Sequence, residues 1–131
     1  MYNNIYILYM KIINIAHVIL GIFLLYIAIK QHSVDKIFYY ILLGIGIISY
    51  VYHIYKYYIT QYWLYLFHIV FLLPLIIIIG FLQNKTPESL YSILLFVAFG
   101  VIGYHGYNVL KDQLNIYHGS ILAIILIILF V

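Results

Sequence analysis

Long apolar segments separated by short polar stretches account for nearly the whole chain. The four long ones extend over about 4–30, 34–58, 61–82 and 87–111, and a shorter one covers 116–131. Because about 20 apolar residues in a helix cross a hydrocarbon core of about 30 Å, the pattern predicts four membrane-spanning helices. At about 1.5 Å per residue the last segment reaches only about 24 Å. It is expected to be a short fifth helix, about 115–131, or the first half of a third repeat.

The composition excludes a soluble domain. Of the 131 residues, 68% are hydrophobic and 7% are charged, which is too few polar side chains to cover a soluble surface. We therefore predict an all-α integral membrane protein, a single polytopic domain over 1–131 in which two tandem helical hairpins form a four-helix bundle followed by the short fifth helix. The chain has no cysteine, so disulfides and thiolate metal sites are excluded.

Two stretches of the chain, 17–56 and 68–111, follow the same pattern. Each begins with a His, crosses an apolar run to a Lys (Lys30 and Lys85), and restarts with a helix-capping signal. Each then returns to a Tyr-His-x-Tyr motif. The motifs are Tyr52-His53-Ile54-Tyr55 and Tyr104-His105-Gly106-Tyr107. The pattern predicts an internal repeat of two hairpins, about 12–58 and about 61–111, followed by the C-terminal helix.

The ends of the expected helices carry recognisable signals. Ser33 is expected to cap the second helix, and Asp35 is expected in its first turn, where a negative charge is favoured by the helix dipole. Pro87 is expected at the first position of the fourth helix, the position that proline prefers. Pro74 lies inside the third helix and is expected to kink it, because proline leaves a backbone carbonyl without its N–H partner.

Five of the six histidines are predicted to lie at one depth near one membrane surface. Counted from the polar residues that flank each segment, they lie about 5–10 Å below the interface at the helical rise. They are His17, His53, His68, His105 and His118, whereas His32 lies at the other end. Ionisable side chains at such a depth are energetically costly, so they are candidate functional residues.

The histidines share helix faces with other small or polar residues. The faces are Asn14, His17 and Gly21 in the first helix; Gly46, Ser49, His53 and Lys56 in the second; and Ala98, His105, Asn108 and Asp112 in the fourth. In a membrane such faces pack against other helices, so these histidines are predicted to converge inside the bundle. By the same reasoning the stripe of Gly100, Gly103 and Gly106 is expected to permit close contact between helices.

Four histidines, His17, His53, His68 and His105, are the candidate ligands of a metal ion or of haem. Imidazole suits Zn, Cu, Fe or Ni, and no Cys or Met lies at this level to favour a softer ion. Haem b held between two facing helices needs one His from each at matching depth. His53 with His105, or His17 with His68, would supply such ligands. Further candidates are His118, Tyr52, Tyr55, Tyr104 and Tyr107, although the tyrosines are equally explained as an interfacial aromatic belt.

Two other interpretations stay open. Histidine changes charge near neutral pH, so the same residues could serve proton transfer or a pore, but the halves of the spans from His17 to Lys30 and from His68 to Lys85 are almost without polar residues. Alternatively, each His only joins helices through a hydrogen bond, in a structural protein. The sequence lacks HExxH, GxSxG and a glycine-rich phosphate loop, so an enzyme is not expected and no catalytic residue is assigned.

The charged residues say little about orientation and exclude one class of partner. Lys11, Lys56 and Lys111 flank one side of the expected bundle, and Lys30, Lys36 and Lys85 flank the other, so the positive-inside rule assigns no orientation. The net charge of +3 is spread singly along the chain, which argues against binding to nucleic acid. The expected partners are the lipid bilayer and other copies of the chain in a homo-oligomer.

The second repeat carries a resemblance to a protein family. Its elements are His68, Pro74-Leu75, Lys85-Thr86-Pro87, Tyr91 and Gly103-Tyr104-His105-x-Tyr107. They resemble small multi-helix membrane proteins, without an assigned activity, that are encoded by large DNA viruses of algae and protists. The resemblance covers less than half of the chain, and it implies a viral membrane protein located in a host-cell or virion membrane.

Overall fold

The computed structural model describes residues 2–111, all of which belong to helices or to the short turns between them. Four segments of this part are long and apolar enough to cross a membrane, as the apolar pattern predicts: Leu8–Ser33, Lys36–Thr60, Trp63–Lys85 and Glu88–Leu110. The all-α prediction is therefore confirmed for the described residues, which contain no strand. The expected fifth helix, with His118, lies outside the described residues.

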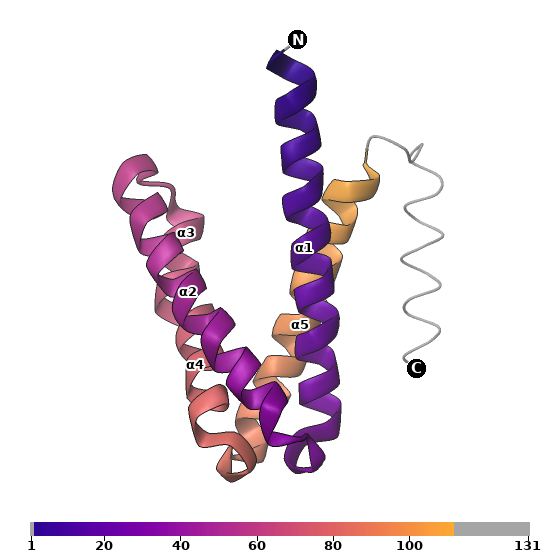
Figure 1. Ribbon diagram of the computed structural model, residues 1–131, viewed down its shortest axis with the longest axis vertical. Coiled ribbons are helices and arrows are strands. Elements are labelled where there is room, and N and C mark those ends of the chain that lie inside the picture. The colour runs from indigo at the N-terminus through magenta and orange to yellow at the C-terminus, as the bar shows by residue number, and fades with distance from the viewer. Residues whose placement is uncertain (1, 112–131) are drawn as a thin grey trace. The chain divides into compact units, whose positions relative to one another are not determined.

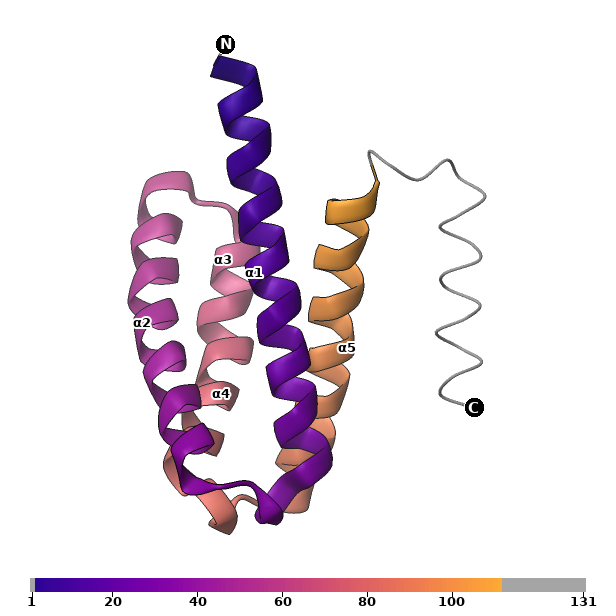
Figure 2. The same ribbon diagram turned by 45° about the vertical axis from the view of Figure 1, so that its right-hand side comes forward.

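The elements follow one another with few connecting residues (Figures 1 and 2). In order they are α1 (Tyr2–Lys30), the 3₁₀ turn η1 (Gln31–Ser33), α2 (Lys36–Thr60), α3 (Trp63–Phe67), the π turn η2 (His68–Leu72), α4 (Leu73–Leu82), the 3₁₀ turn η3 (Gln83–Lys85) and α5 (Glu88–Leu110). Within the described part the chain forms two compact units, which are residues 2–22 with 99–111, and Phe23–Ala98. Each unit is described by itself below.

Glutamine has a positive φ angle at three helix ends. Gln31, Gln61 and Gln83 have φ angles of 47°, 51° and 54°, a conformation that side chains with a Cβ seldom adopt. The Gln61 N–H donates to the Tyr57 carbonyl at 2.8 Å, and the Gln83 N–H donates to the Ile79 carbonyl. These bonds use helix-terminal carbonyls and stop the helix, as a left-handed C-terminal residue usually does. The chain can therefore reverse within a few residues.

Asp35, and not Ser33, caps α2. The Ile37 N–H donates to Asp35 Oδ1 at 3.1 Å, whereas the Ser33 hydroxyl donates to the Lys30 carbonyl at 2.6 Å. The prediction for Ser33 is wrong because Val34 is extended, with φ −72° and ψ 135°, which separates Ser33 from the first turn of α2. The expected proline start of the fourth helix lies one residue before α5, and the Leu90 N–H donates to the Pro87 carbonyl at 3.0 Å.

Pro74 accompanies a π turn in the third apolar segment. Proline has no N–H, so it cannot donate to the carbonyl four residues earlier, which belongs to Val70. Directly before it, the Leu73 N–H donates to the His68 carbonyl, five residues back, and η2 interrupts the α-helix. The irregularity therefore takes the form of a π turn that begins at His68, and such turns are frequent at functional sites.

Small residues bring α2 and α4 close together within the second unit (Figures 1 and 2). A Cβ on Gly80 would lie 2.8 Å from the Leu43 backbone nitrogen, and one on Gly46 would lie 2.9 Å from Ile77 Cγ1. In a membrane such close approach stabilises helix pairs through van der Waals contact. The two glycines therefore fix how closely these helices pack.

The predicted role of the glycine stripe on α5 is wrong for the described part of the chain. A Cβ on Gly100, Gly103 or Gly106 would meet no described atom within 4 Å. The physical reason is rotation about the helix axis. Ala98 is fully buried, and at about 100° per residue Gly100 and Gly103 lie about 200° and 140° around the helix from it.

The buried residues of the second unit recur at a constant spacing along the chain. Four positions in the first hairpin, each 52 residues before a counterpart in the second, are at most 1% exposed, as are their counterparts. These pairs are Leu24 with Ile76, Ile27 with Ile79, Tyr39 with Tyr91, and Leu42 with Leu94. Residues at equivalent positions of the two hairpins are therefore buried alike.

Two buried tyrosines join the hairpin turns of the second unit. Tyr39 OH donates to the Gln31 carbonyl at 2.6 Å, Tyr91 OH lies 3.1 Å from the Gln83 carbonyl, and the two hydroxyl oxygens lie 2.7 Å apart. His32 Nδ1 donates to the Asn84 carbonyl at 2.8 Å between the same turns. These bonds hold η1 and η3 side by side at one end of the helices.

Candidate functional site

His53 and His68 form a stacked pair, which we call the α2–η2 pair. Their ring centroids lie 4.7 Å apart and the ring planes are inclined by 18°. The tight turn at Gln61 explains the pairing, because His53 precedes it by eight residues and His68 follows it by seven. Two antiparallel helices joined by so short a link place such residues at the same height. His53 is 8% exposed, and His68 is half-buried.

His17 and His105 form a second stacked pair, the α1–α5 pair, within the unit of residues 2–22 and 99–111. Their ring centroids lie 4.2 Å apart at an interplanar angle of 20°. One helical turn from His17, a Cβ on Gly21 would lie 2.6 Å from Ile102 Cγ1, so the two helices approach closely there. Both rings are half-buried.

Backbone carbonyls determine the tautomer of three of these histidines. His17 Nδ1 lies 2.7 Å from the Ile13 carbonyl oxygen, and His53 Nδ1 lies 2.7 Å from that of Ser49. His68 Nδ1 lies 2.6 Å from the Leu64 carbonyl oxygen. Because a carbonyl oxygen only accepts, Nδ1 must carry the hydrogen in each ring. In the neutral imidazole Nε2 is then the nitrogen with the lone pair.

His105 reaches the same state through a side chain. Its Nδ1 lies 2.7 Å from Asn14 Oδ1, and Asn14 Nδ2 donates to the Met10 carbonyl at 2.9 Å. Since the amide group of Asn14 uses its nitrogen on Met10, its oxygen faces His105 and requires a donor there. Asn14 is 9% exposed and His105 is half-buried, so this bond is partly buried. All four paired histidines therefore have Nδ1–H bonded to an oxygen.

Aromatic side chains border the α2–η2 pair. Tyr52 and Tyr65 meet the His53 ring edge to face, at centroid distances of 5.5 and 5.7 Å. Phe67 meets His68 at 6.2 Å in the same manner. Tyr52 also carries the Lys56 amine, which lies 5.9 Å above its ring. Each imidazole of the pair therefore contacts at least one aromatic ring besides its partner.

The other tyrosines of the two motifs differ in their relation to the pairs. Tyr104 meets His105 edge to face at 5.0 Å, so of the motif tyrosines Tyr52 and Tyr104 touch a paired ring. Tyr55 and Tyr107 are 59% and 65% exposed, as residues of an interfacial belt would be. His32 bonds Asn84 between the turns, away from His53 and His68.

The hydrogen-bond arrangement is the one that metal-binding histidines use. A ligating imidazole usually donates its second N–H to a carbonyl or carboxylate, which orients the ring and raises the basicity of the ligating nitrogen. The described residues contain no group of three or more His, Cys, Asp or Glu side chains that could hold one ion. Within the described residues each stack therefore brings together two imidazoles and not a larger set of potential ligands.

The sequence identified the four histidines but not how they combine. It suggested His53 with His105 and His17 with His68, whereas the structure stacks His53 on His68 and His17 on His105. It placed Asn14 on the face of His17 without recognising it as the partner of His105. Tyr65 was interpreted only as a residue of the interfacial aromatic belt and not as a site residue, although it lies three residues before His68 and therefore on the same helix face.

Comparison of the chain with protein-family models, with curated proteins and with solved structures gives no match.

Proposed function

We propose that the protein is a multi-pass integral membrane protein that binds a transition-metal ion at each of its two histidine pairs. One observation carries the proposal. In all four rings Nδ1–H is bonded to an oxygen at 2.6–2.7 Å, so Nε2 is the basic nitrogen of the neutral ring. The same tautomer at all four positions makes Nε2 the lone-pair nitrogen of each neutral ring, as ligation through Nε2 requires.

The contact between the rings supports an ion shared by each pair. Two imidazoles on one Zn²⁺ have Zn–N bonds of about 2.0–2.1 Å, so they must lie close together. The ring centroids of the two pairs lie 4.2 and 4.7 Å apart, and because the stacked rings are inclined by only 20° and 18°, they would have to tilt for both Nε2 lone pairs to meet one ion. Nitrogen ligands of this kind suit Zn²⁺, Cu²⁺ or Ni²⁺. With two protein ligands the ion would complete its shell with water or a transferred ligand, which favours metal handling over a structural role.

The same geometry favours a metal ion over haem within either pair. Two axial histidines hold a haem iron from opposite faces of the porphyrin. Rings stacked at 4.2 and 4.7 Å leave no space for a macrocycle between them. Haem b would require the histidines to combine in another way.

Metal binding to variants tests the proposal. The metal-free protein in detergent is dialysed against Zn²⁺, Ni²⁺ or Cu²⁺, and the bound metal is measured by elemental analysis. We expect two ions per chain, one ion in His53→Ala or His17→Ala, and two ions in the matched control His32→Ala. Loading should decrease as the pH is lowered, because protons compete for Nε2.

Three results would contradict the proposal. The first is wild-type protein that retains no more metal than a protein-free dialysis sample. The second is equal metal loading of His53→Ala, His17→Ala and His32→Ala. The third is a Soret band, after expression with haem precursor, that His53→Ala or His17→Ala abolishes, since this would assign the residues to haem. Proton flux into liposomes that depends on the same histidines, in protein without bound metal, would favour the proton-transfer interpretation instead.

The membrane in which the protein resides is a separate proposal. The resemblance of the second repeat to membrane proteins of large DNA viruses supports a host-cell or virion membrane. Localisation of the tagged protein in infected cells and in purified virions tests this, and its absence from both membranes would contradict it.

A further inference from the structure

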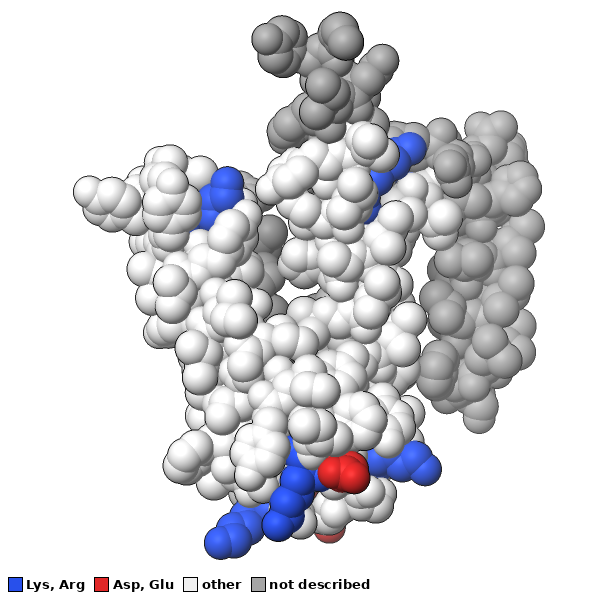
Figure 3. Space-filling view, viewed as in Figure 1, with Lys and Arg blue, Asp and Glu red and all other residues white. Residues whose placement is uncertain are grey.

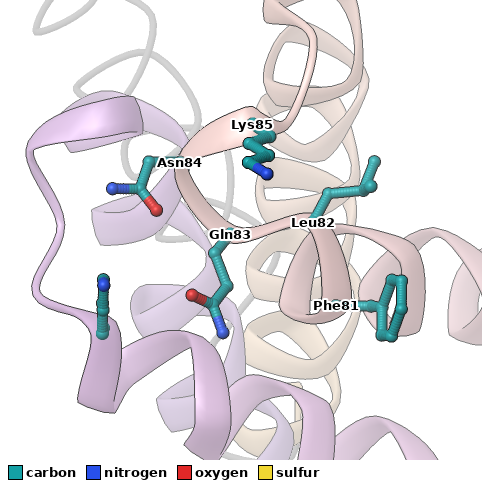
Figure 4. A pocket seen from close by; sticks show the side chains of 6 residues that line it. Phe81, Leu82, Gln83, Asn84 and Lys85 are labelled. Carbon is teal, nitrogen blue, oxygen red and sulfur yellow. The ribbon is translucent and has the colours of Figure 1, made fainter.

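A cavity of about 520 Å³ lies at the turn between α4 and α5. His53 and His68, the histidine pair of the same unit, do not belong to its lining. Its lining residues come from the start of α2, the last turn of α4, and η3: Lys36, Phe81, Leu82, Gln83, Asn84 and Lys85. Figure 4 shows the side chains of the last turn of α4 and of η3 arranged around it. All of these residues belong to one compact unit.

Two of the residues that line the cavity are lysines. Both side chains are exposed. Lys36 begins α2 shortly after η1, and Lys85 ends η3, and the His32–Asn84 hydrogen bond joins these two turns. Asp35 precedes Lys36 and caps α2 by accepting from the Ile37 N–H, and Glu88 follows Lys85 by three residues, but neither acid belongs to the lining of the cavity. Figure 3 shows lysine and acidic side chains gathered at the end of the molecule that carries these turns. The cavity therefore favours a ligand with negative charge.

The remaining lining residues divide into an apolar and a polar group. Phe81 is 73% exposed and belongs, with Leu82, to the last turns of the apolar segment Trp63–Lys85. Gln83 and Asn84 follow immediately and supply amide groups. An apolar wall directly below amides and ammonium groups matches the boundary between acyl chains and headgroups, where basic pockets bind lipid phosphates.

We propose that this cavity binds the headgroup of an anionic phospholipid. The ammonium groups of Lys36 and Lys85 pair with the phosphate, and the amides of Gln83 and Asn84 donate hydrogen bonds to phosphate and glycerol oxygens. An acyl chain lies along Phe81. The inference rests on membrane residence, which it shares with the proposed function, but not on metal binding.

Native mass spectrometry of the full chain tests this. The protein is transferred from mixed micelles that contain equal amounts of phosphatidylglycerol and phosphatidylcholine, and the retained lipids are counted. We expect wild type to retain phosphatidylglycerol in preference. The double variant Lys36→Gln/Lys85→Gln should retain at least threefold less of it. The matched control Lys30→Gln/Lys56→Gln removes the same charge outside the cavity and should retain as much as wild type.

Two further arms keep the result interpretable. Lys36→Arg/Lys85→Arg preserves the charge and should retain the lipid, which separates loss of binding from loss of folding. Glycerol 3-phosphate in the absence of lipid is expected not to bind. Equal loss in the two Gln double variants, equal retention of the two lipids, or binding of free glycerol 3-phosphate would each overturn the proposal. Metal loading measured on the same samples shows whether the metal proposal fails independently.

Discussion

An oxygen atom opposite Nδ1 determines the chemistry open to each paired histidine. In His17, His53 and His68 the oxygen is the carbonyl four residues earlier in the same helix. In His105 it is the side chain of Asn14, which lies 91 residues away along the chain. This difference makes the α1–α5 pair the one whose ring orientation a single side-chain substitution can change.

Asn14→Leu is expected to lower the metal affinity of the α1–α5 pair by about 10–100-fold, the usual effect of losing a partner of a ligating His. The α2–η2 pair should be unaffected. Isothermal titration with Zn²⁺ in a His53→Ala background isolates the affected pair. Asn14→Asp is the control, because a carboxylate accepts the same hydrogen bond and should preserve or strengthen binding. An unchanged affinity in Asn14→Leu would show that Asn14 does not orient His105.

The two tyrosine hydroxyls offer another prediction for single residues. Tyr39 and Tyr91 have two hydroxyl hydrogens for three short contacts, of 2.6, 2.7 and 3.1 Å, so only two of the contacts are hydrogen bonds at one time. The short distance to Gln31 favours donation from Tyr39 to Gln31, and from Tyr91 to Tyr39. The contact between Tyr91 and Gln83 is then the one without a hydrogen.

We therefore expect Tyr39→Phe to lower the free energy of unfolding by about 1 kcal/mol, and Tyr91→Phe to lower it by less. The reason is that Tyr39→Phe removes the shortest bond and leaves Tyr91 with the longest one. Unfolding by SDS in detergent micelles, followed by circular dichroism, measures the difference. A larger effect of Tyr91→Phe would reverse the assignment of donors.

At the scale of the helices, local irregularities and small residues position the site. The π turn η2 begins at the ligand candidate His68 and ends two residues before Pro74. Gly46 and Gly80 set the distance between α2 and α4. The π turn rotates α3 relative to α4, compared with an unbroken α-helix, and α4 packs closely on α2. The position of His68 relative to His53 therefore depends on both features.

Pro74→Ala supplies the missing N–H and removes the reason for the π turn. We expect the segment to become a regular α-helix, which rotates His68 relative to α4 and weakens metal binding at the α2–η2 pair by about 10-fold or more. Titration in a His17→Ala background measures this pair alone. If affinity is unchanged and the NMR contacts between His53 and His68 persist, the π turn has another cause.

Gly80→Ala is expected to lower the free energy of unfolding by about 1–3 kcal/mol, the usual cost of overpacking. Its Cβ would lie 2.8–2.9 Å from Leu43 backbone and Cβ atoms, which cannot move aside separately from α2. Gly44→Ala is the control, since a Cβ there meets nothing within 4 Å and alanine favours a helix by about 0.5–1 kcal/mol. The free energy of unfolding measured in SDS should therefore be higher for Gly44→Ala than for wild type, and lower for Gly80→Ala. Equal stability of the two variants would contradict the close packing of α2 on α4.

For the whole molecule, the hydrogen-bonded turns make a prediction about topology. The turns at Ser33 and Asn84 lie together within one unit, and Thr60 is one helix length away at the end of α2. In a membrane the first two must face the same side and Thr60 the other. The chain has no cysteine, so a single introduced cysteine can be labelled without background.

Cysteines at Ser33 and Asn84 are expected to react with a membrane-impermeant maleimide from the same side of sealed liposomes, and one at Thr60 from the opposite side. Labelling after permeabilisation is the control for accessibility. Reaction of Ser33→Cys and Thr60→Cys from the same side would exclude a membrane-spanning α2.

The order of residues was enough to predict the four apolar segments of membrane-spanning length and to select the histidines as candidate ligands, but not the division of the third segment into α3, η2 and α4. These follow from apolar length and from the cost of a buried imidazole, which depend only on the order of residues along one helix. The fifth helix stays a prediction. Capping by Ser33 failed because one extended residue, Val34, lies between it and α2, and the extended conformation of a single residue is not encoded in helix periodicity.

The packing of the helices sets which imidazoles touch, which oxygen faces His105, and which glycines lie against another helix. Two helices can meet at many rotations and registers that bury similar apolar area, and a rotation of one residue turns a face by about 100°. The turn at Gln61 and the π turn at His68 select one register for His53 with His68. Contacts between residues distant in the chain depend on the rotation and register of the helices, which are set when the helices pack.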